Sequence, residues 1–455
     1  MGKKVEGTRP KNGGNTIAII AMMFLFAMIS FVTNLAAPIG TIWGHIFDNN
    51  ATLGMMGNMM NFAAYLFMGI PAGKMLSKIG YKKTALTAMV IGFIGLFIQY
   101  LSSVTGSDVI CGEVAGSPVP ASFIIYLLGA FICGFCVCML NTVVNPMLNI
   151  LGGGGNRGNQ LIQTGGTLNS LAGTLTPLFV GALIGTLTKD TTIADVTVLL
   201  WIAMGVFVAA FFIISSVAIP EPNANHSSAV KMSHSPWNFR HLVLGVIGIF
   251  FYVGIEVGIP GTLNFYLSDT TAEGAGLGEG ASAIAGAIVA VYWLMMLVGR
   301  FCSSIISGAI STRAQLLSVT TAAIILVVLA IMIPKTVTLP VPEFVSETGA
   351  LVPVSAYLLV ICGLCTSVMW GTIFNLAVEG LGKYTAQASG IFMMMVVGGG
   401  VMPLIQSSLA GSIGYMASYW LVIAMLVYLF FYAFAGYRNV NTDIPVDEEI
   451  DARNL

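Results

Sequence analysis

The chain has 455 residues, of which 56% are hydrophobic and only 8% are charged, whereas about a quarter of an ordinary soluble domain is charged. Its 18 Lys+Arg and 19 Asp+Glu give a formal net charge of −1, so the chain carries no basic footprint for nucleic acid, and its high hydrophobicity excludes a disordered chain. A mean hydropathy of +0.90 predicts instead that most of the chain lies in a lipid bilayer.

The chain contains twelve apolar runs, each near the roughly 20 residues that a helix needs to cross a bilayer. The first run is too long for a signal peptide, and no small-residue cleavage site follows it. The sequence therefore predicts an all-α membrane protein with twelve transmembrane helices. The runs begin near Thr16, Gly54, Thr84, Ser122, Leu161, Thr197, Leu242, Ser282, Leu316, Ala356, Gln387 and Tyr419.

The distribution of Lys and Arg predicts the orientation of these helices. If the N-terminus is cytoplasmic and the runs alternate in direction, sixteen of the eighteen basic residues lie on the cytoplasmic side, and only Lys189 and Lys335 lie outside. Such an excess is the positive-inside pattern. We therefore expect both termini to lie in the cytoplasm. We interpret the chain as a protein of a bacterial inner membrane.

A polar stretch at residues 220–241 separates six runs from six. The expected organisation is a cytoplasmic tail (1–15), a six-helix half (16–219), a cytoplasmic linker (220–241), a second six-helix half (242–437) and an acidic tail (438–455). Two parallel halves joined in this way are the plan of the major facilitator fold.

An internal repeat supports this division. The fourth run contains ICGFC at 132–136, the tenth contains ICGLC at 361–365, and a Leu-Gly pair follows each, at 151–152 and 381–382. Both Cys pairs lie in apolar surroundings without His or charge nearby, so we interpret them as remnants of the repeat rather than as zinc ligands. With no catalytic constellation either, we expect no metal, no cofactor and no enzyme.

The cytoplasmic end of the second run resembles the facilitator signature G-x-x-x-D-R-x-G-R-K. Gly73, Lys78 and Gly80 match its pattern, whereas Ser77 stands where Asp is usual, and Arg300 follows the eighth run in a weaker echo. We expect these residues to govern the conformational change. Arg300 is expected at the cytoplasmic end of its helix, where a long basic side chain reaches water.

Glu256 is the one ionisable residue predicted deep in the membrane, where such residues are functional candidates by default. It shares a helical face with Tyr252, Pro260 and Asn264, which predicts that this face lines a cavity, and Pro260 permits a local break in the helix. We predict a role for Glu256 in ion coupling or substrate binding; a structural hydrogen bond to a neighbouring helix is the alternative.

Other uncharged polar and aromatic residues recur in several runs, and one alone would be interpreted as a contact between helices. Together they indicate a hydrated cavity suited to a polyol, because amides donate and accept hydrogen bonds and rings stack on sugars. We see no Arg or Lys deep in a run, which argues against anionic substrates. With Glu256, the predicted substrate contacts are Asn34, Asn141, Asn145, Gln163, Tyr252, Asn264, Trp370 and Asn375.

The order of short motifs resembles the fucose/glucose/galactose sugar–cation symporters of the major facilitator superfamily over nearly the whole chain. The second half contains FYVGIE at 251–256, GRF at 299–301, TIF at 372–374, GLG at 380–382 and GGG at 398–400. The first half contains LNT at 140–142, Asn145-Pro146 and Asn169-Ser170. The resemblance implies the twelve-helix fold and transport of a neutral hexose such as glucose, galactose or fucose.

The chain departs from that family in two respects, of which the first concerns coupling. The proton-coupled fucose type has an Asp and a Glu at the positions of Asn34 and Asn141, and an Asn cannot exchange a proton near neutral pH. Glu256 is then the remaining candidate to bind H⁺, or Na⁺ with help from amide and backbone oxygens. The span-five Gln is also displaced: Gln163 lies six residues before Asn169, whereas the family spacing of three falls on Gly166.

We therefore expect a monomeric, ion-coupled sugar importer that works by alternating access. The alternatives are a sugar uniporter and a facilitator for another neutral or cationic solute, such as an amino sugar, a nucleoside or an exported drug. A sugar sensor is disfavoured, because the cytoplasmic stretches of about 20 residues are shorter than the 50 or so that a domain needs.

Overall fold

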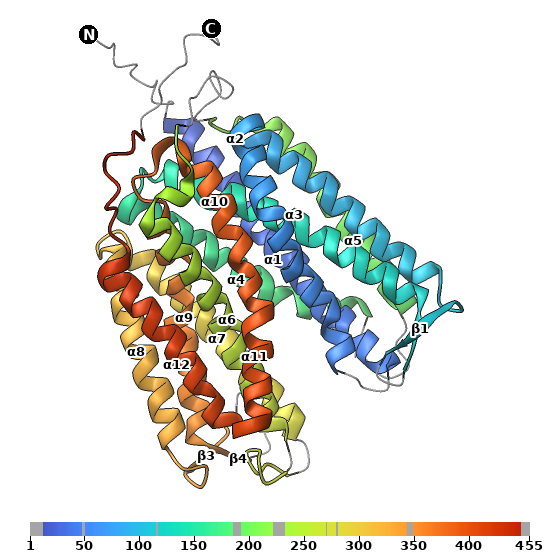
Figure 1. The fold of residues 1–455 in the computed structure, drawn as a ribbon. Helices are drawn as coiled ribbons and strands as arrows, with labels where there is room; N and C mark the ends of the chain where they lie inside the picture. Colours follow the sequence, from blue (N-terminus) through green and yellow to red (C-terminus); the bar gives the residue numbers. More distant parts are fainter. Residues whose placement is uncertain are drawn as a thin grey trace, which may run out of the picture.

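A computed structural model describes residues 12–47, 51–114, 117–184, 193–221, 233–269, 271–278, 281–343 and 349–446, and it is built almost entirely of long helices (Figure 1). The tails and the middle of the linker predicted above lie largely outside the described residues. The first part of the chain contains α1 (Asn12–Ile46), α2 (Ala51–Val104), β1 (Ile110–Val114), β2 (Ser117–Pro120), α3 (Ala121–Leu151), α4 (Gly155–Ile184), the 3₁₀ turn η1 (Ile193–Val196) and α5 (Thr197–Ser216).

The second part follows a short 3₁₀ turn, η2 (Pro236–Asn238), and has the same kind of architecture. It contains α6 (Arg240–Ser268), α7 (Ala281–Ile306), α8 (Thr312–Met332), β3 (Thr338–Pro340), β4 (Leu351–Pro353), α9 (Val354–Val378), the turn η3 (Gly382–Tyr384), α10 (Thr385–Met394), the turn η4 (Met395–Val397), α11 (Gly398–Ile413), α12 (Tyr415–Phe431) and the π-helical turn η5 (Tyr432–Gly436).

The helices of the described residues account for the twelve predicted spans. Ten segments are long and apolar enough to cross a membrane. One of them, Met56–Val104, holds two spans, because Gly80 (φ 86°) breaks α2 in its middle, and α4 supplies the last span although it is too polar to be counted among the ten. The protein is therefore a multi-pass membrane protein with twelve spans, as the sequence predicts.

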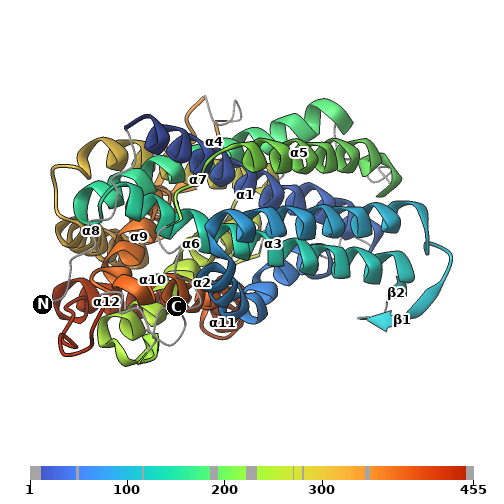
Figure 2. The same ribbon diagram turned by 90° about the horizontal axis from the view of Figure 1, so that it is seen from above.

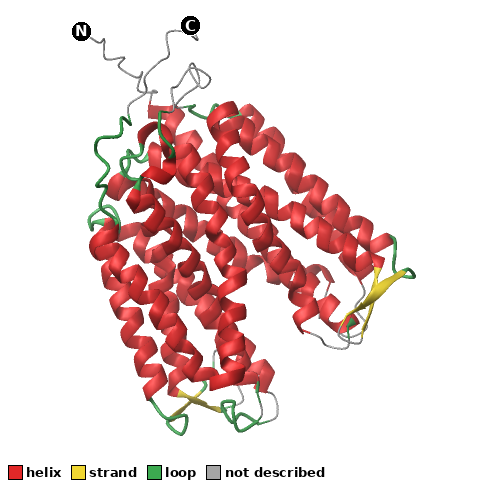
Figure 3. Ribbon diagram, in the orientation of Figure 1, coloured by secondary structure: helices red, strands yellow, loops and turns green. Residues whose placement is uncertain are grey.

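The helices form two groups that meet at one end of the molecule. In Figure 1 the blue-to-green helices α1, α2, α3 and α5 diverge from the green-to-red helices α6, α8, α9 and α12 towards the end that carries the β-hairpins, and Figure 3 shows these hairpins as yellow strands in the same orientation. Figure 2 shows the two groups side by side from above. We call the end at which α1 begins the closed end, and the hairpin end the far end.

The two hairpins occupy equivalent places in the two groups. Strands β1 and β2 pair antiparallel between the third and fourth spans, and β3 and β4 pair antiparallel between the ninth and tenth. A hairpin at the same point of each half is independent structural support for the internal repeat predicted from the Cys-containing segments.

Helices α2 and α10 approach each other through glycines near the closed end. A Cβ on Gly69 would lie 2.6 Å from the carbonyl oxygen of Gly390, and a Cβ on Gly390 would lie 2.6 Å from the Cα of Gly73. Only glycine allows two helix backbones to come this close. Gly73, singled out from the facilitator signature, thus lies at a contact between the two groups of helices.

The last residues of the same signature are hydrogen-bonded by the carboxylate of Glu221, which follows α5 in the chain. Glu221 accepts hydrogen bonds from the backbone N–H groups of Tyr81 and Lys82, both at 2.7 Å. These are among the first N–H groups of the third span, which lack partners within the helix and favour negative charge. Ser77, which replaces the usual Asp, bonds only to the carbonyl of Lys74 in its own helix, and Lys78 is exposed.

Replacing Glu221 with Ala should destabilise the protein without removing transport. The change deprives the third span of its cap, at a cost of about 1–2 kcal/mol. We expect the Tm of the purified protein in detergent to fall by about 2–4 °C per kcal/mol lost. Glu113→Ala, in the exposed strand β1, is the control, and an equal loss of Tm in both variants would contradict the capping role.

Candidate functional site

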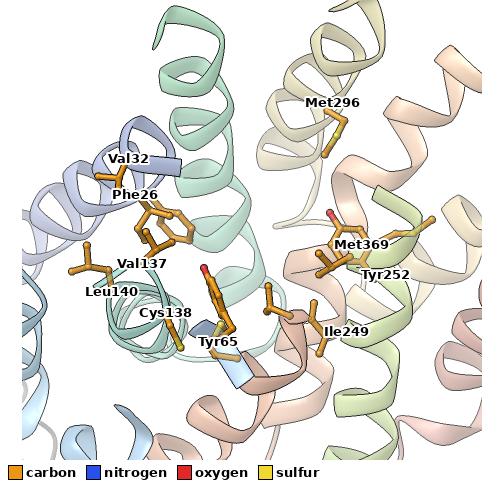
Figure 4. Close-up of a cluster of buried hydrophobic side chains, with 14 of the residues drawn as sticks. Phe26, Val32, Tyr65, Val137, Cys138, Leu140, Ile249, Tyr252, Met296 and Met369 are labelled. Carbon is orange, nitrogen blue, oxygen red and sulfur yellow. The ribbon is translucent and has the colours of Figure 1, made fainter. Parts of the chain in front are cut away.

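The candidate site lies between the two groups of helices. Figure 4 shows side chains from the two groups facing each other, with Tyr65, Val137 and Cys138 on one side and Ile249, Tyr252 and Met369 on the other. All six residues are buried, and none is more than 6% exposed. The walls are therefore apolar, and the polar groups described below are set into them.

On the first half, amides of α3 and a tyrosine of α2 form a chain of hydrogen bonds. The Asn141 amide donates to the Tyr65 hydroxyl at 2.8 Å, and the Asn145 amide donates to the Asn141 backbone carbonyl at 2.9 Å. Both Asn side chains are buried, at 6% and 0% exposure. Asn141 and Asn145 are therefore brought together, as their spacing of four residues predicts.

Trp370 of α9 joins this chain to the second half. Its indole N–H donates to the Asn145 side-chain oxygen at 3.1 Å, and its ring packs edge-on against Tyr252 at 6.2 Å and Phe392 at 6.3 Å between centroids. An aromatic platform beside fixed amides is the arrangement expected for a polyol, whose C–H face stacks on a ring while its hydroxyls bond to amides.

Glu256 forms an ion pair with Arg300, which corrects two of our predictions. The Arg300 guanidinium lies 3.1 Å from the Glu256 carboxylate, and the side chains are 11% and 15% exposed. Arg300 was expected at a helix end in water, and no basic residue was expected deep in the bundle. Both expectations are wrong because they follow the position of the backbone, whereas the long side chain extends inward to a carboxylate that is costly to bury alone.

Arg300 also links the two groups of helices. Besides Glu256 on α6, its guanidinium donates to the Ser170 hydroxyl at 2.7 Å and to the Gly166 carbonyl at 3.4 Å, both on α4. Glu256 and Ser170 each lie about midway along their helices. Its three partners therefore place this basic group between the halves at mid-membrane depth.

The backbone around Glu256 is held by the neighbouring helix α7. Pro260 cannot donate to the Glu256 carbonyl, and the Tyr292 hydroxyl donates to that carbonyl instead at 3.3 Å, while also lying 3.0 Å from the Thr366 hydroxyl of α9. The local break that Pro260 permits does not occur, since α6 is continuous through Pro260.

Two further predicted substrate residues form contacts between the halves. Asn375 accepts from the amide of Asn149 and donates to the Gly155 carbonyl at 2.9 Å and to the Thr312 hydroxyl at 3.0 Å. Gln163 donates to the Val368 carbonyl at 2.9 Å. Asn375 therefore lies apart from Trp370 in a contact between the halves, whereas Gln163 lies against Val368 and Gly371, on either side of Trp370 in α9.

Asn34 and Asn264 are the remaining predicted substrate residues, and they lie at the margin of the site. Among the described residues we find no hydrogen bond from either side chain to a second helix. The Asn34 amide donates to the carbonyl and hydroxyl of Ser30 in its own helix, at 2.9 and 3.1 Å, and faces Gly173 of α4. Asn264 is half-buried two turns beyond Glu256 towards the far end, and we find no hydrogen bond of its side chain to a described residue.

Three residues of these networks were missed in the sequence. Tyr65 follows Asn61 by four residues and precedes Gly69 and Gly73 at the same step, so a stripe of polar and small residues on one face of α2 could have indicated it. Asn149 continues the four-residue series of Asn141 and Asn145. Phe392 carries no such signal, because it is one of 26 Phe in an apolar chain.

Every hydrogen bond between the two halves that we find among the described residues lies at mid-membrane depth or nearer the closed end. They are the bonds of Trp370, Arg300, Gln163 and Asn375 given above and one from Ser389 to the Thr142 carbonyl at 3.2 Å. Within the described residues no group of three or more His, Cys, Asp or Glu could hold a metal. The fold and site together define a two-halved membrane carrier.

Comparison with known proteins shows the family. The Major Facilitator Superfamily model matches residues 19–402, and the glucose/galactose transporter of Brucella abortus is 32% identical over 446 residues, or 95% of this chain and 97% of that protein. The chain therefore belongs to the Major Facilitator Superfamily, a family of membrane transporters rather than enzymes.

More distant relatives agree with this assignment. The putative glucose/galactose transporter of Helicobacter pylori is 27% identical over 93% of this chain and 98% of that protein. The crystal structure of the Escherichia coli fucose:proton symporter FucP superimposes with a TM-score of 0.72 at 17% identity, covering 92% of this chain and 98% of that one. The proton:xylose symporter XylE gives 0.64 at 12% identity, covering 93% and 97%.

Proposed function

We propose that this chain imports a neutral hexose, coupled to a cation, by alternating access of the site between its halves. The observation that carries this proposal is the bond from the Trp370 indole to Asn145, which joins an aromatic platform on one half to paired amides on the other. The relatives from Brucella and Helicobacter are named as glucose/galactose transporters, and these sugars agree with this chemistry.

The positive-inside pattern supports a cytoplasmic location for the closed end, because Lys74, Lys78 and Lys83 lie exposed beside it. In that orientation the structure faces outward. Import would then proceed when the contacts of Gly390, Asn375 and Trp370 between the halves separate and the far end closes.

In this proposal the residues divide into two roles. Asn141, Asn145, Tyr252 and Trp370 contact the sugar, with Asn34 and Asn264 at the margin, and Glu256 holds the coupling ion, H⁺ or Na⁺. Gln163, which lies against α9 beside Trp370, contacts the sugar as well, whereas Asn375 acts with the motif residues Gly73, Lys78 and Gly80 in the closed end.

A ligand panel on the purified protein tests the substrate class. A ligand that binds only the folded state stabilises it by about 2.7 kcal/mol at 100 times its Kd, so thermal unfolding detects it. We expect glucose or galactose to raise Tm, and expect no rise with a nucleoside, an amino sugar or a lipophilic cation. A rise with the lipophilic cation alone would favour the drug-exporter alternative.

Replacing Trp370 with Phe should weaken sugar binding more than it slows transport. Phe keeps an aromatic face but loses the N–H that fixes Asn145, and a neutral hydrogen bond contributes about 1 kcal/mol. We expect the KM for glucose to rise by about fivefold, with the maximal rate within about twofold of wild type. Trp293→Phe, on an exposed part of α7, is the matched control. An unchanged KM in Trp370→Phe would remove Trp370 from the sugar site.

A further inference from the structure

The ion pair between Glu256 and Arg300 sits beside the aromatic platform. Tyr252, which packs against Trp370, lies one turn before Glu256 on the same face of α6. It is also the one ion pair found among the described residues. Because both side chains keep some exposure, at 11% and 15%, a cation or a sugar hydroxyl arriving from water can reach them.

The Arg300 guanidinium donates hydrogen bonds to one charged acceptor and to two neutral acceptors. One terminal nitrogen donates to the Glu256 carboxylate, and the other donates to the Ser170 hydroxyl and the Gly166 carbonyl. Of the helices packed around Glu256, α7 offers Arg300 and Tyr292, α4 offers Ser170, and α6 itself offers Tyr252. No second carboxylate faces Arg300 among these groups.

We propose that Arg300 is a sugar-binding residue in the loaded transporter, and that it serves as the counter-ion of Glu256 in the empty one. This inference rests on the proposed function. When a hydronium ion transfers its proton to a Glu256 carboxylate oxygen, one O–H bond of hydronium breaks, one O–H bond forms on the carboxyl group, and a water molecule is released. The guanidinium keeps its charge and loses its charged acceptor. Na⁺ bound at the carboxylate would have the same electrostatic effect.

A buried guanidinium that lacks a charged acceptor is costly, and Ser170 and Gly166, both neutral, bond to only one of its two terminal nitrogens. Neighbouring hydroxyls of a hexose supply the missing acceptors, so sugar binds better after the cation. By linkage the cation must then bind better after the sugar. One side chain thus makes the two ligands depend on each other without any direct contact between them.

The test is the dependence of the KM for labelled glucose on the cation, measured in proteoliposomes at acid and alkaline pH and with and without Na⁺. In wild type we expect the KM to fall by about fivefold or more with the coupling cation, the range of typical linkage. In Arg300→Gln the KM should be high and independent of the cation, and Arg300→Lys, which keeps the charge, should restore part of the dependence.

The control is Arg313→Gln, which removes an Arg of the same half that lies over the Tyr437 ring, away from the site, and it should behave like wild type. If Arg300→Gln transports glucose with the wild-type dependence on the cation, the inference is wrong while the proposed function stands. If the wild type transports no hexose, the proposed function fails and this inference falls with it.

Discussion

Glu256→Gln should abolish accumulation of sugar while leaving exchange intact. Gln has the shape of a protonated Glu but can neither gain nor lose a proton, so the variant resembles a carrier that is permanently loaded with its cation. A membrane potential of about 100 mV is worth about 2.3 kcal/mol per charge, which supports about 50-fold accumulation when one cation accompanies each sugar. We expect about 50-fold accumulation of glucose in wild type and none above equilibration in Glu256→Gln.

Two further variants make this result interpretable. Glu379→Gln changes an exposed acid just beyond the end of α9 and should accumulate sugar like wild type. Breaking a buried ion pair can cost about 3–5 kcal/mol, and the double variant Glu256→Gln/Arg300→Gln removes the charge that Glu256→Gln leaves unpaired. Because it also removes the proposed sugar ligand, the double variant is compared by Tm alone, and we expect it to regain most of the Tm lost in Glu256→Gln. Accumulation by a folded Glu256→Gln protein would show that coupling resides elsewhere.

Gly390→Ala should displace the equilibrium between the two states of the carrier. The added Cβ would collide with the Gly69 carbonyl and lie 2.6 Å from the Gly73 Cα, and these are backbone atoms that cannot rotate away. Overpacking of this kind costs about 1–3 kcal/mol, which would favour separation of the closed end by about 5- to 150-fold. We expect glucose uptake to fall by about tenfold as the outward-facing state is depleted.

A thiol at Ser389 can report this change directly. Ser389 is fully buried beside Gly390. Ser389→Cys should therefore react with a membrane-impermeant reagent only when the closed end separates. The exposed Cys111 and Cys302 are replaced by Ser, so that they do not react with the reagent themselves. We expect labelling from the side of the closed end to rise about fivefold in Gly390→Ala. Gly205→Ala adds a Cβ to a helix where nothing lies within 4 Å, and equal labelling in the two variants would contradict the role of the glycine contact.

The fold was predictable because the bilayer imposes it. Length and hydropathy determine helices of about 20 residues, and the Cys-containing repeat indicates two halves before any coordinates are considered. The polarity of α4 did not prevent its prediction, since the apolar run that begins near Leu161 was counted among the twelve. Periodicity does not reveal how the second and third spans are connected: a single residue with positive φ, Gly80, joins the two helices of α2 directly, without a loop.

The site was only partly predictable, because sequence spacing describes one helix at a time. Asn141 and Asn145 share a face, and the structure brings them together. The pairing of Glu256 with Arg300 depends on how α6 and α7 pack and on the reach of a long side chain, neither of which periodicity contains. Asn375 was predicted beside the sugar for its residue type, but its partners, Asn149, Gly155 and Thr312, are known only from the tertiary contacts.

The most direct test of the proposed function is counterflow in proteoliposomes that contain the wild-type protein. Vesicles loaded with unlabelled glucose are diluted into a trace of labelled glucose without any ion gradient, so the result does not depend on the identity of the coupling cation. We predict that label accumulates transiently above equilibrium and that unlabelled galactose competes with it. If label enters no faster than into protein-free vesicles, and galactose changes nothing, the chain does not carry hexoses and the account of the site given above is wrong.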